Sequence, residues 1–148
     1  MPDLADFARL VPLDHGLCVV VTRRADLTPH TSVVNAGVIR DPSTGLESVA
    51  FVSVSTTRKL INLRLDRTIA VVIRVGWQWV SVEGRATLVG PDDPQPGVDD
   101  EQLRLLLREI FSAAGGEHGN WEEFDQTMQQ ERRTAVFVAP LRVVPQLG

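Results

Sequence analysis

The sequence predicts a mainly β protein, an antiparallel barrel with a pair of helices inserted before its last strand. Six valine-rich segments have the length and composition of strands, and turn-forming residues separate most of them closely. One acidic stretch toward the C-terminal end shows helical periodicity instead. Short strands joined by tight turns favour an antiparallel barrel over a parallel sheet.

The strand-like segments begin after a short amphipathic helix, which the pattern of residues 4–11 predicts and which ends before Pro12. The predicted strands are residues 17–22, 30–39, 46–54, 69–75, 78–89 and 134–144. Turn chemistry separates the first three, with Pro29 ending one turn and Gly45 ending the next. Gly84 interrupts the fifth strand, which is typical of a bulge or a corner in a closed barrel.

Two helices are predicted between the fifth strand and the last, in an insertion of about residues 99–131. Apolar side chains in the first helix recur at i, i+3, i+4, i+7, i+8 and i+11, which places them on one face. They are Leu103, Leu106, Leu107, Ile110, Phe111 and Ala114. This helix ends at Gly115 and Gly116, and Asn120 caps the second helix, with Glu123 at the capping-box position.

The length of 148 residues predicts one domain, residues 1–148, and 43% hydrophobic with 23% charged residues is ordinary for a soluble globular protein. No apolar run approaches the roughly 20 residues that a membrane helix needs, so no membrane association is expected. The start, Met1 to Asp6, lacks the cationic and apolar parts of a signal peptide, which indicates a cytoplasmic protein. Cys18, the single cysteine, lies in an apolar run and is predicted to be a buried thiol rather than a nucleophile.

Charge is unevenly distributed along the chain. Residues 92–131 hold eleven acids and two arginines, a net charge of −9, so a chain of net charge −4 leaves +5 on the remaining residues. A basic body without a basic helix or a basic tail does not suit nucleic acid. It suits a small anionic ligand, whereas the acidic insert is also consistent with a solvated helical face.

A candidate anion site lies at residues 55–66, where a strand gives way to a short helix. Ser55, Thr56 and Thr57 supply hydroxyls, and Arg58 and Lys59, the only lysine of the chain, add two positive charges. A helix N-terminus also presents unpaired N–H groups and the positive end of its dipole. This combination predicts a phosphate site, and the alternative is a capped surface helix whose two cations face solvent.

The motifs of several enzyme classes are absent from the sequence. It contains no glycine-rich dinucleotide motif, P-loop, paired cysteines, zinc-protease motif or nucleophile elbow. His15, His30 and His118 are too scattered to propose a metal site, so no metal is expected. Paired acids lie in a loop or at helix starts, where they complement the helix dipole. Any chemistry would therefore come from a bound cofactor.

A pair of tryptophans stands at the start of the fifth predicted strand, next to Gly76. Trp77 and Trp79 are two residues apart, which places both indoles on one face of an extended strand. The pair fits a stacking wall for a flat ring or a dimer contact, and it fits core packing equally well.

Several separate stretches together resemble the split-barrel superfamily of pyridoxamine 5′-phosphate oxidase-like flavin and deazaflavin proteins. The stretches are residues 29–35, Thr57-Arg58-Lys59, Asn62-Leu63-Arg64 with Asp66, Gly76-Trp77 and Val82-Glu83-Gly84. The second half is similar to the actinobacterial branch that uses the deazaflavin coenzyme F420, in residues 101–108, 116–118, 121–122 and 131–133. Arg58 directly precedes Lys59 as in the oxidase branch, whereas the deazaflavin branch usually has a basic residue at the position of Thr57.

The resemblance implies a six- or seven-stranded FMN-binding-type split barrel that forms a homodimer, with two cofactor sites along the dimer interface. The implied cofactor-binding residues are His30, Thr31, Ser32 and Val33 along the ring, Val52, Ser53, Thr57, Arg58 and Lys59 at the phosphate, and Trp77 near the ring from either subunit. No residue of the sequence looks like a dedicated acid or base, so the catalytic residues are unknown.

The leading hypothesis is an oxidoreductase that binds reduced F420 and transfers its hydride to a small organic acceptor, which the sequence does not identify. One alternative is an FMN-dependent oxidase or reductase of the same fold, and another is a protein that binds the cofactor without turnover. F420 carries a long anionic tail, whereas FMN ends in one phosphate. The arginines expected to serve the longer anion are Arg23, Arg24, Arg64, Arg67 and Arg74.

Overall fold

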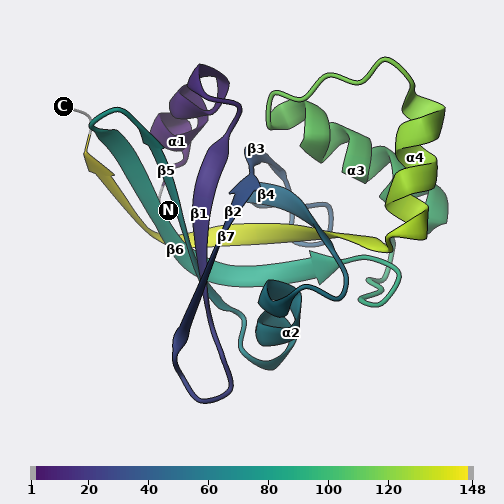
Figure 1. Ribbon diagram of the computed structural model, residues 1–148, viewed down its shortest axis with the longest axis horizontal. Helices are drawn as coiled ribbons and strands as arrows, with labels where there is room; N and C mark the ends of the chain where they lie inside the picture. Colours follow the sequence, from purple (N-terminus) through teal and green to yellow (C-terminus); the bar gives the residue numbers. More distant parts are fainter. Residues whose placement is uncertain (1–2, 147–148) are drawn as a thin grey trace.

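The computed structural model describes residues 3–146 and is mainly β, with strands that curl around a core and helices at its margins (Figure 1). In chain order the elements are α1 Ala5–Leu10, the 3-10 helix η1 Val11–Leu13, β1 Leu17–Arg23, β2 Pro29–Asn35, β3 Gly37–Arg40, β4 Glu47–Val54, α2 Arg58–Leu65, β5 Thr68–Val75, β6 Gln78–Val89, α3 Asp100–Ala113, α4 Trp121–Gln130 and β7 Arg133–Gln146. Met1 and Pro2, the first residues of the stretch for which no signal peptide is expected, lie outside the described residues. Within residues 3–146, no helix has both the length and the apolarity to cross a membrane.

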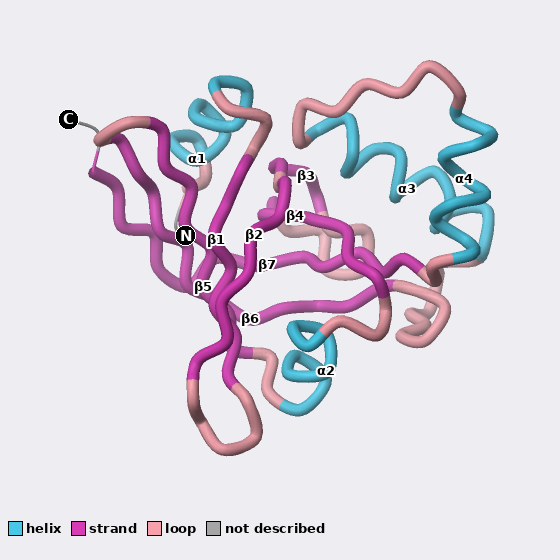
Figure 2. The backbone as a smooth tube through the Cα atoms, viewed as in Figure 1, coloured by secondary structure: helices cyan, strands magenta, loops and turns pink. Residues whose placement is uncertain are grey.

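All the strands form one antiparallel sheet in the order β2-β1-β5-β6-β7-β4-β3. β2 and β3 are therefore the two edges of the sheet, although only Ala36 separates them in the chain. Consecutive Cα atoms are about 3.8 Å apart, so the two edges must meet at Ala36. The sheet is rolled into a barrel that is split between β2 and β3 (Figure 2), which confirms the predicted fold class.

The prediction of one continuous strand over residues 30–39 is wrong, because the chain changes partners at Ala36. β2 pairs with β1, whereas β3 pairs with β4. The N–H of Ala36 donates to the carbonyl oxygen of Gly16 at 2.9 Å instead of to a strand. A Cβ on Gly37 would lie 2.6 Å from the Ala113 carbonyl oxygen, so the small residue there lets the end of α3 approach the barrel.

The bulge predicted at Gly84 and the inserted helical pair are both confirmed. The register between β6 and β7 shifts between Glu83 and Gly84, and a Cβ on Gly84 would lie 2.1 Å from the carbonyl oxygen of Ala139. The close approach of β7 at this corner therefore requires glycine. The helices of the insert begin at the N-caps Asp99 and Asn120, and Asp99 forms a complete capping box.

Trp77 does not share a strand with Trp79. β5 ends at Val75, and Gly76, with φ of +60°, forms the turn before β6 together with Trp77. Trp77 is 90% exposed, whereas Trp79 is half-buried. Within one chain Trp77 is therefore not a core residue, and the expectation of two indoles side by side on one strand is wrong.

The N-terminal helix closes one end of the barrel. Phe7 and Leu10 of α1 are fully buried, and Pro12 continues the chain in η1 rather than ending all helical structure. Proline is tolerated there because the early N–H groups of a helix have no intrahelical partner. Cys18 is buried as predicted, and burial raises the pKa of its thiol to about 12, so it remains a packing residue.

Two apolar cores share the strands β4 and β7. Phe51 and Val136 on one face of these strands belong to the barrel core, while Ala50 and Phe137 on the other face belong to a second core. Residues of α3 and α4, such as Ile110, complete the second core. The helical pair is thus packed against the outside of the barrel at β3, β4 and β7.

Candidate functional site

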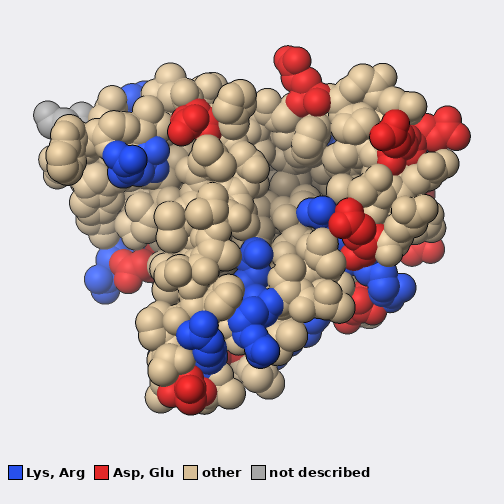
Figure 3. Space-filling model, in the orientation of Figure 1, with Lys and Arg blue, Asp and Glu red and all other residues tan. Residues whose placement is uncertain are grey.

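A cleft of about 740 Å³ lies between the barrel and the helical pair. Its lining residues are His15, Val33, Val34, Asn35, Val52, Ser53, Val54, Thr57, Lys59, Ile110, Phe111, Ala114, Gly115, Gly116, His118, Phe124, Thr127, Met128 and Arg133. Figure 3 shows the surface hollowed between the two parts, with basic side chains below the hollow and acidic ones over the helices. The volume falls within the roughly 300–1,000 Å³ typical of small-molecule sites.

One end of the cleft is the start of α2, where two hydroxyls meet. Thr57 is the N-cap residue, but no side chain caps the first turn of α2. The Thr57 hydroxyl instead lies 2.9 Å from the Ser53 hydroxyl, and both residues line the cleft. The first-turn N–H groups and the two hydroxyls therefore form a set of donors suited to an oxyanion.

Two cations from distant parts of the sequence converge at this end. Burial lowers the pKa of Lys59, and the nearby Arg133 lowers it further. The Nε of Arg133 is buried without a hydrogen-bond partner among the described residues, and its Nη2 makes only long contacts of 3.3 Å to Glu131. No carboxylate of residues 3–146 lines the cleft. Lys59 and Arg133 therefore repel each other, and Arg133 has an unpaired N–H donor. A bound anion would stabilise both cations.

An ion-pair network holds the turn that precedes α2. Arg64 donates to Asp93 at 2.9 Å through Nε and to the carbonyl oxygen of Ser55 at 2.9 Å through Nη1. The Ser55 hydroxyl donates to Asp92 at 2.6 Å, and Asp92 also pairs with Arg132. Hydrogen bonds from Arg132 first and Ser55 second hold the pKa of Asp92 well below its usual range. The network links the turn, the loop after β6 and the segment before β7.

On β2, His30 and Ser32 are half-buried, and each leaves a buried polar atom unpaired. Nδ1 of His30 and Oγ of Ser32 are buried without a hydrogen-bond partner among the described residues. Burial lowers the pKa of His30, and the charges of Arg24, Lys59 and Arg58 lower it further, in that order. His30 therefore lies close enough to the cations at the start of α2 for their charges to lower its pKa.

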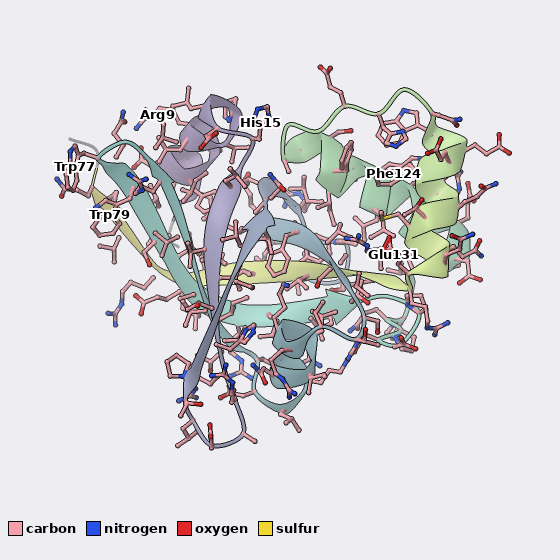
Figure 4. All side chains as sticks on the ribbon, viewed as in Figure 1. Arg9, His15, Trp77, Trp79, Phe124 and Glu131 are labelled. Carbon is pink, nitrogen blue, oxygen red and sulfur yellow. The ribbon has the colours of Figure 1, made fainter. Side chains whose placement is uncertain are left out.

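The structure brings part of the predicted site together. The predicted residues that line the cleft are Val33, Val52, Ser53, Thr57 and Lys59, and those outside its lining are His30, Thr31, Ser32, Arg58 and Trp77. Strand alternation does not explain the difference on β2, because Thr31 is on the same face as Val33 and does not line the cleft, whereas Val34 lines it from the opposite face. The cleft is lined only by the C-terminal end of β2, residues 33–35. Figure 4 shows Trp77 at the far end of the β5–β6 hairpin, across the molecule from Phe124 and Glu131.

The five arginines expected to serve an anionic tail are engaged elsewhere. Arg64 binds Asp93 and Ser55, and Arg23 pairs with Asp66 at 2.7 Å. Arg24, Arg67 and Arg74 each donate to a backbone carbonyl oxygen.

Arg133, which belongs to the last of the family-like stretches, is the cation that sequence reasoning missed. Its position directly after the helical pair was the available signal, but only the pairing of β7 with β4 places it opposite Val54 and near Lys59. His15 and His118 also line the cleft, although they were considered only as metal ligands.

No family model matches the chain, but solved structures share its fold. A conserved hypothetical protein from Mycobacterium tuberculosis aligns with a TM-score of 0.70 and 18% identity over 99% of this chain and 86% of its own. A structure described as an F420 reductase aligns with a TM-score of 0.63 and 15% identity over 99% of this chain and 100% of its own. A candidate pyridoxamine 5′-phosphate oxidase from Listeria innocua aligns with a TM-score of 0.59 and 16% identity over 97% of this chain and 98% of its own. The chain therefore has the split-barrel fold of these proteins.

The lowered pKa of Asp92 predicts how acid destabilises the protein. A carboxyl with a lowered folded-state pKa contributes its full stability above the unfolded-state value of about 4, and loses it as pH falls toward the folded-state pKa. Asp92→Asn should therefore lower the urea concentration at the unfolding midpoint at pH 7. Below pH 5, this midpoint should fall less steeply with pH in the variant than in wild type. Urea titrations across this pH range measure both effects. Glu122→Gln, at an exposed position on α4, is the control, and equal acid slopes for wild type and Asp92→Asn would contradict the prediction.

Proposed function

We propose that the cleft binds a phosphate-bearing cofactor of the flavin type, with the deazaflavin F420 as the first candidate, in a homodimeric cytoplasmic oxidoreductase. The observation that carries the proposal is the convergence of Lys59 and Arg133 on the uncapped start of α2, beside the hydroxyls of Ser53 and Thr57. When bound, the cofactor would supply the hydride that reduces a small organic acceptor.

The residues present fit a phosphate. Ser53 and Thr57 offer hydroxyl donors, and Lys59 and Arg133 offer charged donors that no carboxylate of the described cleft lining neutralises. Hydrogen bonds between charged partners are about twice as strong as neutral ones, and the helix dipole favours the same charge. The protein's part would be to bind and orient the cofactor, since no side chain is placed as a dedicated acid or base toward it.

Beyond the phosphate end, the cleft offers apolar surface for a flat ring. Val33 on β2 and Val52 on β4 line the barrel side, and Ile110 and Phe111 on α3 line the helical side. A flat ring system fits against the apolar barrel side and leaves the helical side open to a second molecule, and the few polar groups at the end would fix the direction of the ring.

Four observations bear on the choice between F420 and FMN. The stretches similar to the deazaflavin branch and the additional cation Arg133 support F420, whose tail extends the anion. The engagement of the other arginines and the Arg58-Lys59 order favour FMN, which needs charge at one phosphate only. FMN is therefore the second candidate, and binding without turnover is the third, which a search for hydride transfer would distinguish.

The proposed homodimer rests on exposed apolar residues of the sheet. Leu17, Val19 and Val33 are 41%, 43% and 65% exposed, and Val19 pairs directly with Val33 across β1 and β2. The exposed Trp77 at the hairpin tip adds an indole that the chain itself does not cover. A contiguous apolar surface of this kind is typical of an interface, and Val33 connects it to the cleft.

Removing Lys59 should weaken cofactor binding. Lys59→Ala is expected to cost about 1.5–3 kcal/mol of binding free energy, the typical contribution of a charged hydrogen bond, and Arg133→Gln should act in the same direction. Titration calorimetry with the preferred cofactor measures the change. Arg9→Ala removes one charge at α1, away from the cleft lining, and should leave the affinity unchanged. Wild-type affinity in both Lys59→Ala and Arg133→Gln would mean that the phosphate binds elsewhere.

Purified protein should be colourless and should bind F420 more tightly than FMN. The preference should decrease as salt rises, because screening acts most on the extended anionic tail. Fluorescence titration with each cofactor at two ionic strengths tests this directly. A yellow preparation that retains stoichiometric FMN through dialysis, without a response to F420, would reject F420 and leave FMN as the cofactor.

Val19→Glu should convert the proposed dimer to a monomer. A buried unpaired carboxylate in an apolar interface costs several kcal/mol, whereas the same side chain is well solvated in a monomer. Light scattering at micromolar concentration gives the mass, and circular dichroism checks that the barrel remains folded. Leu105→Glu, at a 49% exposed position on α3, is the matched control and should remain dimeric. A wild-type protein that is monomeric at this concentration would contradict the homodimer.

A further inference from the structure

The end of the cleft away from the cations is formed by aromatic rings of the helical insert. Phe111, His118 and Phe124 all line the cleft, and Trp121 packs behind them. The ring centroid of His118 is 6.2 Å from that of Phe111 and 5.6 Å from that of Phe124, in edge-on arrangements. These contacts hold His118 in an apolar wall, which we call the aromatic wall and define as Phe111, His118 and Phe124.

Within this wall the orientation and the proton of His118 are both determined. The backbone N–H of Asn120 donates to Nδ1 of His118 at 3.1 Å, so Nδ1 carries a lone pair and the proton of the neutral ring is on Nε2. Among residues 3–146 no hydrogen bond engages Nε2. His118 is half-buried and therefore has one N–H donor without a partner among the described residues.

The aromatic wall is separate from the phosphate end. His118 precedes the N-cap of α4, and Arg133 follows its C-terminal end, so the full helix lies between them. Ten residues of α-helix, Trp121–Gln130, span about 15 Å at 1.5 Å per residue. A phosphate held near Arg133 therefore leaves the aromatic wall to another group.

Val33 and Val52 line the same cleft from the barrel side. A cofactor ring placed against Val33 and Val52 would leave the aromatic wall as the opposite surface. Apolar pockets with one placed polar group are how small-molecule sites combine affinity with orientation. Edge-on aromatic contacts of the kind already present in the wall suit a further flat ring.

We propose that the aromatic wall binds the hydride acceptor, and that this acceptor is a flat, uncharged ring compound with an oxygen that accepts a hydrogen bond from Nε2–H of His118. The assignment of the ring compound as the acceptor rests on the proposed function, because it requires a cofactor on the opposite side of the cleft. The binding of the ring compound to the wall does not depend on the cofactor.

The test uses two probes of the same shape, 2-acetylnaphthalene and 2-ethylnaphthalene, which differ in the acceptor oxygen. Ligand-observed NMR titration of the protein without cofactor gives both affinities. Wild type should prefer the acetyl probe by about tenfold, the effect of one good hydrogen bond in an apolar site. His118→Phe keeps a ring in the wall and should bind both probes equally, whereas His118→Gln keeps an N–H donor and should restore part of the preference.

Three results would overturn the inference: no binding of either probe, no preference in wild type, or a preference that survives in His118→Phe. Cofactor titration of the same proteins distinguishes a failure of the proposed function. His118→Phe should bind the cofactor as wild type does, and Lys59→Ala should bind the probes as wild type does. Probe discrimination without any cofactor binding would retain the ring site and reject its role as an acceptor site.

Discussion

The burial of both faces of β4 and β7 is the constraint on which the cleft depends. Alternate side chains of β4 and of the first half of β7 point into the barrel core or into the core beneath α3 and α4, and both sets are largely buried. The inserted helices therefore cannot pack elsewhere without exposing Ala50 and Phe137 to water. Because they are held there, the space between them and β2 is a fixed cleft rather than a gap between two mobile parts.

The same packing separates the charges that the sequence mixes. Asp125 of the acidic insert pairs with Arg104 and Arg108, and the loop acids Asp92 and Asp93 pair with arginines outside the cleft. The described lining of the cleft consequently holds cations and neutral groups only. In an acidic protein the potential inside the cleft is set by the nearest side chains, and the net charge of −4 is a poor guide to the ligand.

The two ends of the cleft differ in chemistry, and the fold explains why. The phosphate end is built where β4 leads into α2, which brings a helix N-terminus to the edge of the barrel. The aromatic wall is built from the insert, which packs on the outside of the barrel and is joined to it only through β6 and β7. The barrel therefore supplies most of the proposed cofactor site, and the insert supplies the proposed acceptor site. A fold shared with solved structures establishes neither site by itself.

The sequence by itself determined the mainly β class, the helical insertion, the corner at Gly84 and the donor-rich start of α2, because each depends on local periodicity or on one residue's conformation. Only the tertiary structure decided that residues 30–39 divide between two edges, because strand pairing is not a local property. It also decided that Arg64 is bound to Asp93 while Arg133 reaches the cleft. Charge patterns along a chain do not reveal which cations are already paired, since ion pairs form between residues that only folding brings together.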